Sequence, residues 1–366
     1  MTTSVSTRIT TMLGLEFVRK VIRRLVIRPV NRVQEYSVQT CKRAARYSPS
    51  LCRFFATVIG SRCSTEQYRF LRGRWRHQRG QGQVYFLRRS VHRVEKGLMM
   101  PKRKEVFALG YILPTVKVLQ RHCGDDERVS NTEYSWFHSV LSRYFEVVAG
   151  PEVVEKARAV FEELPEPPDN PGAGRTPFES AERPSSDIGP GELLDLSRQR
   201  KSVRWYQDRQ VPRRLLDRAV DIARQAPSAC NRQPFHFWIF DDPDLVADIA
   251  DIPMGLSGCD REPPVLIAVV GEQRAFEHER DRHVIYIDGS LAAMNLMLAL
   301  ETLGLASCPV NWPDIPEKEK ELRDTIDLDA DQQVVMFLTA GYPNPDGKVA
   351  WSERKPVERM RRYNAE

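Results

Sequence analysis

Apolar positions in the second half of the chain follow two different patterns. Three short apolar runs have the length of β-strands: 235–240, 264–270 and 333–340. The second run is apolar throughout, which is typical of a central strand covered on both faces. Helical spacing predicts a helix over 215–223, before Pro227, and a long apolar helix over 286–303, before Gly304. We therefore expect an α+β domain over 193–366, in which helices flank a mixed sheet.

The first half of the chain has helical periodicity. Over residues 103–163, apolar residues recur three or four positions apart, as in Val106, Leu109, Ile112, Val116 and Leu119. Residues 164–192 contain seven prolines among glycines and acidic residues, a composition that predicts an extended linker. The expected organisation is a basic, mostly α-helical region over 1–163, a linker over 164–192 and the α+β domain over 193–366.

Residues 11–28 combine an apolar stripe with a cationic stripe. On a helix, Phe17, Val21 and Leu25 share one face, and Arg19 and Arg23 lie beside it. Such a helix can face the core of an N-terminal bundle, lie on an anionic lipid surface or dock on a protein partner. The pattern leaves these three interpretations open.

Charge separates the chain into two parts. The net charge is +6, but residues 1–100 contain 21 Lys and Arg against 4 Asp and Glu, and the remainder contains 34 against 45. The basic part favours phosphates, nucleic acid or an anionic membrane surface. The seven cysteines show no C-x-x-C spacing, and the histidines show no metal-ligand spacing. We therefore expect no metal site, a cytoplasmic protein and, if residues 11–28 bind lipid, peripheral attachment at the inner face of the membrane. The sequence has no run of 18 apolar residues, so no membrane-spanning helix is expected.

Residues 68–93 alternate arginines with aromatic residues. This pattern can bind single-stranded nucleic acid, or it can form a helix–turn–helix whose aromatics are buried and whose arginines are solvated. No RRM, KH or DNA-binding motif accompanies it, which disfavours nucleic acid. Further on, Gly97 has the position of a helix C-cap before Pro101. His92 and Glu95 lie one helical turn apart, as an acid–base pair or as a simple contact on a helix surface.

Three segments contain groups suited to a phosphorylated, polar cofactor. The first has three cations and a hydroxyl within five residues: Arg200, Lys201, Ser202 and Arg204. The second reads Ala-Pro-Ser-Ala-Cys-Asn-Arg-Gln-Pro-Phe over 226–235, and the third joins Gly-Tyr-Pro at 341–343 to Glu-Arg-Lys-Pro at 353–356. Taken alone, the first segment is equally a solvated basic turn. In this order and spacing, residues 195–366 resemble the nitroreductase family of FMN-dependent oxidoreductases.

The resemblance implies a role for each segment. Arg200, Lys201 and Ser202 would bind the FMN phosphate, and Arg204 would reach the ring or the ribityl chain. The turn formed by Pro227, Ser228 and Ala229 would border the cofactor from a neighbouring subunit. Asn231 would hydrogen-bond the pyrimidine edge, although on its own it is equally an Asx turn. Arg354, or the adjacent Lys355, would close over the phosphate.

The segment 304–312 resembles the family's loop that passes the face of the flavin. Pro309, Val310 and Asn311 would border the ring, and the backbone N–H of Asn311 would donate to flavin N5, making Asn311 the catalytic candidate. Trp312 stands where the family commonly has glycine, and it either narrows the pocket, stacks on substrate or belongs to the core. No His or Lys in the adjacent sequence marks Cys308 as a nucleophile, so we interpret it as an inert buried thiol.

Two further resemblances concern assembly and setting. The helix 288–300 resembles the family's dimer helix, with small residues at 289, 290, 292 and 293, so an obligate homodimer is expected. The segment 91–101 is similar to one found upstream of the reductase domain in proteins associated with surface-polysaccharide synthesis. The function expected is transfer of hydride between NADH or NADPH and an organic small molecule through FMN. The alternative is a flavin-fold scaffold whose basic half binds anionic membrane or nucleic acid.

Overall fold

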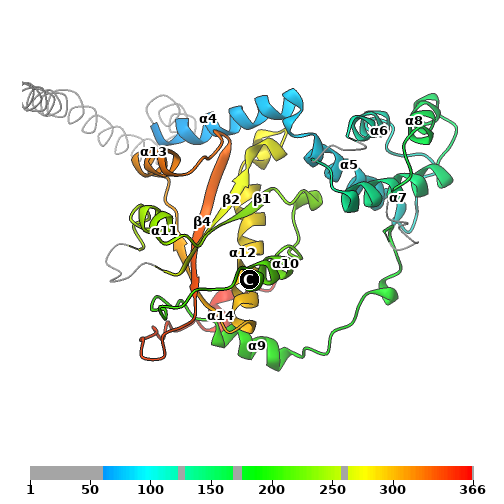
Figure 1. Ribbon diagram of the computed structural model, residues 1–366. Coiled ribbons are helices and arrows are strands. Elements are labelled where there is room, and N and C mark those ends of the chain that lie inside the picture. Colours follow the sequence, from blue (N-terminus) through cyan, green and yellow to red (C-terminus); the bar gives the residue numbers. More distant parts are fainter. Residues whose placement is uncertain (1–60, 123–127, 168–174, 257–262, 365–366) are drawn as a thin grey trace, which may run out of the picture. The chain divides into compact units, whose positions relative to one another are not determined.

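The computed structural model describes residues 61–122, 128–167, 175–256 and 263–364 (Figure 1). The chain divides into two units, Met1–Tyr68 with Asp314–Pro316 and Arg69–Pro313 with Glu317–Glu366. Helix α4, Ser61–Arg76, spans the boundary between them. The amphipathic stretch 11–28 lies outside the described residues, so its three interpretations remain open.

A four-stranded sheet in the order β1-β2-β4-β3 forms the centre of the second unit. Its strands are β1 Phe235–Phe240, β2 Val265–Glu272, β3 Ala306–Asn311 and β4 Gln332–Gly341. All three pairings are antiparallel, and a parallel bridge between Ser202 and Ser307 adds a short neighbour at the β3 edge. Every residue of β2 is buried, which confirms the prediction of a central strand.

Helices cover both faces of this sheet (Figure 1). Helices α10, Arg213–Ala223, and α12, Val284–Thr302, enclose one hydrophobic core with the first face. Helices α11, Pro243–Ala250, and α13, Pro316–Thr325, enclose a second core on the opposite face. The α+β class is thus confirmed, with helix α9, Pro190–Gln199, packed against α12.

Helix α12 is apolar because it is a core helix. Among the described residues, the stretch Glu279–Thr302 is long and apolar enough to cross a membrane, but half of it is buried inside the molecule. Gly289 faces Val335, where an added Cβ would lie 3.3 Å from Cγ2. The small residues Gly289, Ala292 and Ala293 therefore face the helix's own protomer. Ser290 lies on the exposed face with Ile287, Leu291 and Met294.

Four further helices have a core of their own: α5 Gln83–Leu98, α6 Ile112–Arg121, α7 Asn131–Val147 and α8 Glu152–Glu162. They confirm the helical character predicted over 103–163. Helix α7 begins with a capping box, because Ser130 Oγ accepts from the Glu133 N–H and Glu133 accepts from the Ser130 N–H.

The remaining elements are short: η2 His77–Gln81, η3 Ser180–Glu182, η4 Ala229–Asn231, η5 Gln273–Ala275, η6 Glu279–Asp281 and α14 Val357–Met360.

Two local expectations were wrong. Gly97 is not a C-cap, because α5 continues to Leu98 and is capped by Met99. Glycine is needed there because an added Cβ would lie 2.1 Å from Cε2 of Phe107. The segment after Gly304 is not a loop but strand β3, because its backbone pairs with β4 from Ala306 to Asn311.

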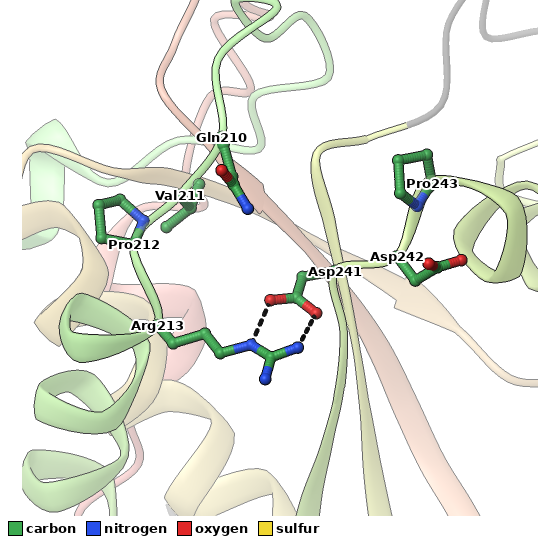
Figure 2. A pocket seen from close by; sticks show the side chains of 7 residues that line it. All are labelled: Gln210, Val211, Pro212, Arg213, Asp241, Asp242 and Pro243. Atoms are coloured by element: carbon green, nitrogen blue, oxygen red, sulfur yellow. Dashed lines mark hydrogen bonds and ion pairs between the residues drawn. The ribbon is translucent and has the colours of Figure 1, made fainter.

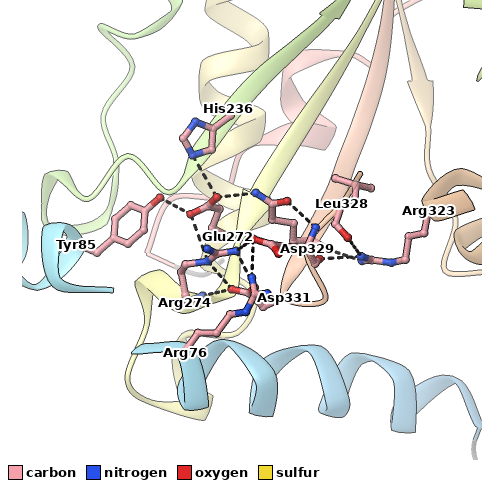
Figure 3. A network of polar contacts seen from close by, with 10 residues as sticks. Arg76, Tyr85, His236, Glu272, Arg274, Arg323, Leu328, Asp329 and Asp331 are labelled. Atoms are coloured by element: carbon pink, nitrogen blue, oxygen red, sulfur yellow. Dashed lines mark hydrogen bonds and ion pairs between the residues drawn. The ribbon is translucent and has the colours of Figure 1, made fainter. Parts of the chain in front are cut away.

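A polar network joins the first helices of the second unit to the ends of β2 and β4 (Figure 3). Arg76 NH1 lies 2.8 Å from Oδ1 of Asp331, whose side chain is fully buried, and Arg274 donates to the same carboxylate. The Tyr85 hydroxyl donates to Glu272 over 2.7 Å. Burial, together with the Glu272 carboxylate, raises the pKa of Tyr85 well above its ordinary value. Residues 69–98 are thus bonded to the sheet by buried charged groups. The domain boundaries at 163 and 193 remain a prediction.

Candidate functional site

The first cationic segment follows helix α9 directly. The Arg200 N–H caps α9 by donating to the Leu196 carbonyl, and the Val203 N–H donates to the Ser307 carbonyl over 3.1 Å. Ser202 forms the parallel bridge to Ser307. Arg204 is exposed, and its guanidinium donates a long bond of 3.4 Å to the Ser202 carbonyl. The segment therefore adds three cations and a hydroxyl to the β3 edge of the sheet.

The C-terminal segment meets the first one. Lys201 Nζ lies 5.9 Å from the centre of the Trp351 ring, and Trp351 Nε1 donates to Glu353 over 2.8 Å. The Glu353 carboxylate also accepts the N–H of Arg354. The hydrogen bond from Trp351 comes first among the causes that lower the pKa of Glu353, and the charges of Arg354 and Lys201 add to it. The charges of Arg354 and Lys201 thus both lower the pKa of the Glu353 carboxylate. Lys355, the residue after Arg354, is exposed.

Strand β3 is an edge strand whose outer side faces this cationic segment. Because the Ser307 carbonyl accepts from Val203, the backbone groups of Ser307 point away from β4. Backbone orientation alternates along a strand, so the Asn311 N–H points the same way. It has no backbone acceptor in the described part of the chain. Pro309, between them, is exposed and has no N–H to donate.

Ser307 also contributes an unsatisfied hydroxyl. Its side chain is fully buried, and its Oγ has no hydrogen-bond partner among the described residues. A buried hydroxyl without a partner costs about 1–3 kcal/mol, and this one belongs to the residue of β3 that pairs with Ser202. Residue type and position assign no role to Ser307, because nothing in the sequence distinguishes a buried unpaired hydroxyl from a paired one.

Val310 is placed differently from its neighbours. Its side chain belongs to the core on the α11 and α13 face, and its backbone, by the same alternation, faces β4. Val310 therefore offers no outward backbone group that would support its predicted contact with a cofactor.

The second motif segment forms a tight turn held by its own side chains. Ser228 Oγ accepts the Gln233 N–H, and Gln233 Nε2 donates to Oδ1 of Asn231 over 2.9 Å. Cys230, Asn231 and Gln233 all have left-handed backbone, with φ of 54°, 51° and 52°. The Asn231 amide N–H groups have no protein acceptor among the described residues. They therefore remain available to a ligand carbonyl. Pro227, just before the turn, is exposed.

The two groups of candidate residues lie at opposite ends of α12 within one protomer. The Ala229 N–H donates to Asp288 over 3.0 Å, near the start of the helix. Gln199 donates to Glu301, near its end, and Glu301 also accepts the Lys201 N–H. Thirteen residues separate the two carboxylates, or roughly 20 Å along a helix axis. Asn231 and Lys201 of the same protomer therefore do not form one site.

Other candidates have structural roles. Trp312 is buried against Phe337, with Nε1 donating to Glu319, and Cys308 is buried in the core. Glu95 lies 3.4 Å from His92 within α5, and it accepts from Trp136 of the neighbouring helix α7. The guanidinium groups of Arg72 and Arg79 lie over the Trp75 ring, 4.7 and 4.6 Å from its centre. The ring is thus in contact with arginines of the protein itself. The described residues contain no cluster of side chains able to hold a metal ion.

The structure also has an open pocket of about 480 Å³ at the start of α10 and the end of β1 (Figure 2). Arg213 and Asp241 form a two-point ion pair in it, with distances of 2.7 and 2.8 Å. The Arg213 guanidinium lowers the pKa of Asp241. The pocket includes none of the predicted site residues. Arg213 and Asp241 pair with each other, and Asp242 accepts the Leu245 N–H at the start of α11.

The fold and this edge together define an α+β protein with a cationic segment beside strand β3. The family model described as "Nitroreductase family" matches residues 197–257 and 255–342. A protein of Methanothermobacter thermautotrophicus named "Putative NADH dehydrogenase/NAD(P)H nitroreductase" is 28% identical over 155 residues, which are 42% of this chain and 78% of the relative. Residues 197–342 of this chain are therefore similar in sequence to the nitroreductase family.

Two other similarities have a comparable extent. An iodotyrosine deiodinase of Thermotoga neapolitana is 27% identical in an alignment of 201 positions that covers 47% of this chain and 98% of the relative. A solved structure described as an FMN-dependent nitroreductase from Clostridium difficile has 21% identity, covers 43% of this chain and 92% of its own, and has a TM-score of 0.38. Each alignment thus covers less than half of this chain.

Proposed function

We propose that this protein is an FMN-dependent oxidoreductase that transfers hydride between NADH or NADPH and an organic small molecule. The observation that supports this most directly is the β3 edge, where Ser202 and Val203 bring the cations of 200–204 to Ser307, and where Asn311, further along the same strand, has an outward N–H. These groups fit a cofactor that has both a phosphate and a polar ring. Bound FMN would accept hydride at N5 and pass the electrons to a second substrate.

The basic side chains would hold the phosphate. Arg200, Lys201 and Arg204, with Ser202, offer charge-assisted donors on one short segment, and Arg354 and Lys355 offer more from the C-terminal segment. The contact between Lys201 and Trp351 supports a common binding place for both segments. Their role is to neutralise the phosphate and to fix the position of the ring.

Asn311 would act through its backbone. A preorganised N–H aimed at the atom that gains or loses hydride stabilises the charge that develops there. Pro309, exposed and without an N–H, would border the same face. No nucleophilic side chain is required, in agreement with the structural role of Cys308.

A second subunit would complete the site. Asn231 and the turn Pro227-Ser228-Ala229 lie roughly 20 Å from Lys201 along α12, so they would serve the site of the partner. Helix α12 exposes Ile287, Leu291 and Met294 at helical spacing, which gives an apolar face for a twofold contact. The C-terminal segment exposes Trp351, Val357 and Met360 and would lie on the partner. We therefore propose an obligate homodimer.

The names of the relatives do not identify one organic substrate. Their names include nitroreductase, NADH dehydrogenase and iodotyrosine deiodinase, which act on different acceptors or donors. The resemblance of 91–101 to proteins of surface-polysaccharide synthesis supports a sugar or glycan intermediate as the substrate. We propose a cytoplasmic setting, with the basic N-terminal part as the candidate for contact with an anionic membrane.

Substitution at Asn311 tests the proposed backbone donor. Asn311→Pro removes the N–H, and an outward-facing edge position tolerates proline, as Pro309 shows. We expect flavin reduction by NADH or NADPH to slow by about 10²-fold, the usual effect of removing one such donor.

The matched control is Asn311→Ala, which removes the side chain and keeps the N–H. It should reduce flavin at close to the wild-type rate in a stopped-flow measurement. Equal rates in the proline and alanine variants would exclude the backbone of Asn311 from the reaction.

A further inference from the structure

Helix α5 reaches the turn that contains Asn231. Arg88 Nε donates to the Asn231 carbonyl over 2.8 Å, and Arg88 NH1 pairs with Glu133 over 2.5 Å. The guanidinium also lies 5.4 Å from the centre of the Trp136 ring. One side chain therefore joins α5, the first turn of α7 and the turn at 228–233, although more than 140 residues separate Arg88 from Asn231.

The turn needs an external contact because its backbone is strained. Three of its residues other than glycine have left-handed φ, a conformation that is rarely populated and that persists only when surrounding contacts fix it. The Ser228 hydroxyl and the Gln233 amide fix the turn from within. Asp288 holds its start through the Ala229 N–H, and Arg88 holds Asn231 itself.

Arg88 differs from a surface arginine in geometry and environment. Its side chain is 11% exposed, and Glu133 is fixed by the capping box of α7. A guanidinium presents its donors in a rigid planar fork, so a fixed Glu133 also fixes the direction of Nε toward the Asn231 carbonyl. The position of the turn is thus tied to the helical core of α5 to α8.

We propose that Arg88 is a positioning residue for the cofactor site, through which helices α5 to α8 set the affinity for flavin. This inference rests on the proposed function, because Asn231 is taken as the group that meets the pyrimidine edge. With its carbonyl held by Arg88 and its Oδ1 held by Gln233, Asn231 presents its amide N–H groups in one direction. The helical region is then a part of the cofactor site rather than an independent module.

Arg88→Met in the full chain tests the proposal by two measurements. Titration with FMN, followed by quenching of flavin fluorescence, should show affinity weaker by about tenfold, the usual effect of losing one charge-assisted hydrogen bond. The circular dichroism of the bound flavin in the visible region should also change, which a purely global loss of stability would not cause. Hydrogen exchange of the FMN-free protein should show faster exchange of amides 229–233.

Arg93→Met is the matched control. Arg93 lies on the same helix and stacks on Tyr111 at 3.9 Å, and it is not bonded to the turn. It should leave both FMN affinity and the exchange of 229–233 at wild-type values. If Arg88→Met does not fold, Arg88→Lys keeps the charge beside Glu133 and removes only the planar fork, and it should shift both measurements in the same direction.

The outcomes separate the two claims. Wild-type affinity together with wild-type exchange in the Arg88 variants would overturn the role of Arg88. Faster exchange with unchanged affinity would also overturn it, because the turn would then be held but would not matter for flavin. If the wild-type protein binds no FMN, the proposed function fails, and the exchange measurement alone decides whether Arg88 holds the turn.

Discussion

Gly97 shows how a single packing contact reverses the usual effect of a substitution. Replacing glycine by alanine inside a helix normally stabilises a protein by about 0.5–1 kcal/mol. Here the new methyl group would lie 2.1 Å from Cε2 of Phe107, so the ring or the helix must move. We expect Gly97→Ala to destabilise the protein by about 1–3 kcal/mol in urea unfolding.

Gly110 provides the comparison for this prediction. No atom lies within 4 Å of a Cβ built there, and its φ is not left-handed. Gly110→Ala should change stability by less than about 0.5 kcal/mol. A Gly97→Ala protein as stable as the wild type would mean that α5 and Phe107 are not packed as described.

Single residues also limit what the sequence can predict about the site. The three motif segments are recognised from residue type and spacing. The structure joins 200–204 to β3 through the bridge between Ser202 and Ser307, and to the C-terminal segment through Lys201 and Trp351, whereas 226–235 lies at the other end of α12. Arg88 and Ser307 were missed as site residues, because their roles depend on contacts between segments far apart in the chain. Trp312 could be assigned to the core only once its bond to Glu319 was known.

At the scale of elements, pH dependence tests how α4 is attached to the sheet. The hydrogen bond from Arg76 is the largest cause that lowers the pKa of Asp329, from 3.8 to about 2. The hydrogen bond from His77 is likewise the largest cause that lowers the pKa of Glu277, from 4.5 to about 2. A lowered carboxylate pKa contributes stability that is present above about pH 4 and lost as the pH falls toward 2.

Arg76→Met should therefore lower the urea midpoint at pH 7 and reduce its further fall between pH 4 and pH 2. Arg143→Met is the control, because Arg143 forms an exposed pair with Glu146 on α7 and should have little effect at either pH. Parallel midpoint curves for Arg76→Met and the wild type would contradict the attachment through Asp329.

Elements were predicted well where periodicity alone decides them. The three strand runs and the two helices of the second half agree with β1, β2, β4, α10 and α12 to within a few residues. Strand β3 was taken for a loop because Pro309 and Gly304 weaken its pattern, whereas pairing with β4 on one side only suffices to form an edge strand. Backbone pairing between distant segments is not visible in local composition.

At the scale of the whole molecule, the proposed dimer predicts that a variant unable to dimerise also binds FMN more weakly. Leu291→Glu with Met294→Glu puts two carboxylates on the exposed face of α12 without entering the core of the protomer. Burying such charges at an interface without partners is strongly unfavourable. We expect a monomer in sedimentation velocity and FMN affinity weaker by more than about tenfold.

Met99→Glu is the control, because Met99 is also an exposed methionine and lies at the end of α5, away from α12. It should leave both the mass and the affinity unchanged. A double variant that remains dimeric, or a monomer that binds FMN as tightly as the wild type, would contradict a site shared between subunits.

The most direct test of the central claim is the visible absorption spectrum of the purified full-length protein, before and after anaerobic addition of NADH or NADPH. We predict the bands of oxidised FMN, present on purification or after FMN is added, and their bleaching by at least one of the two nucleotides. A protein that stays colourless after addition of FMN would contradict the cofactor assignment. Bound flavin that neither nucleotide bleaches would contradict the proposed hydride transfer from NAD(P)H.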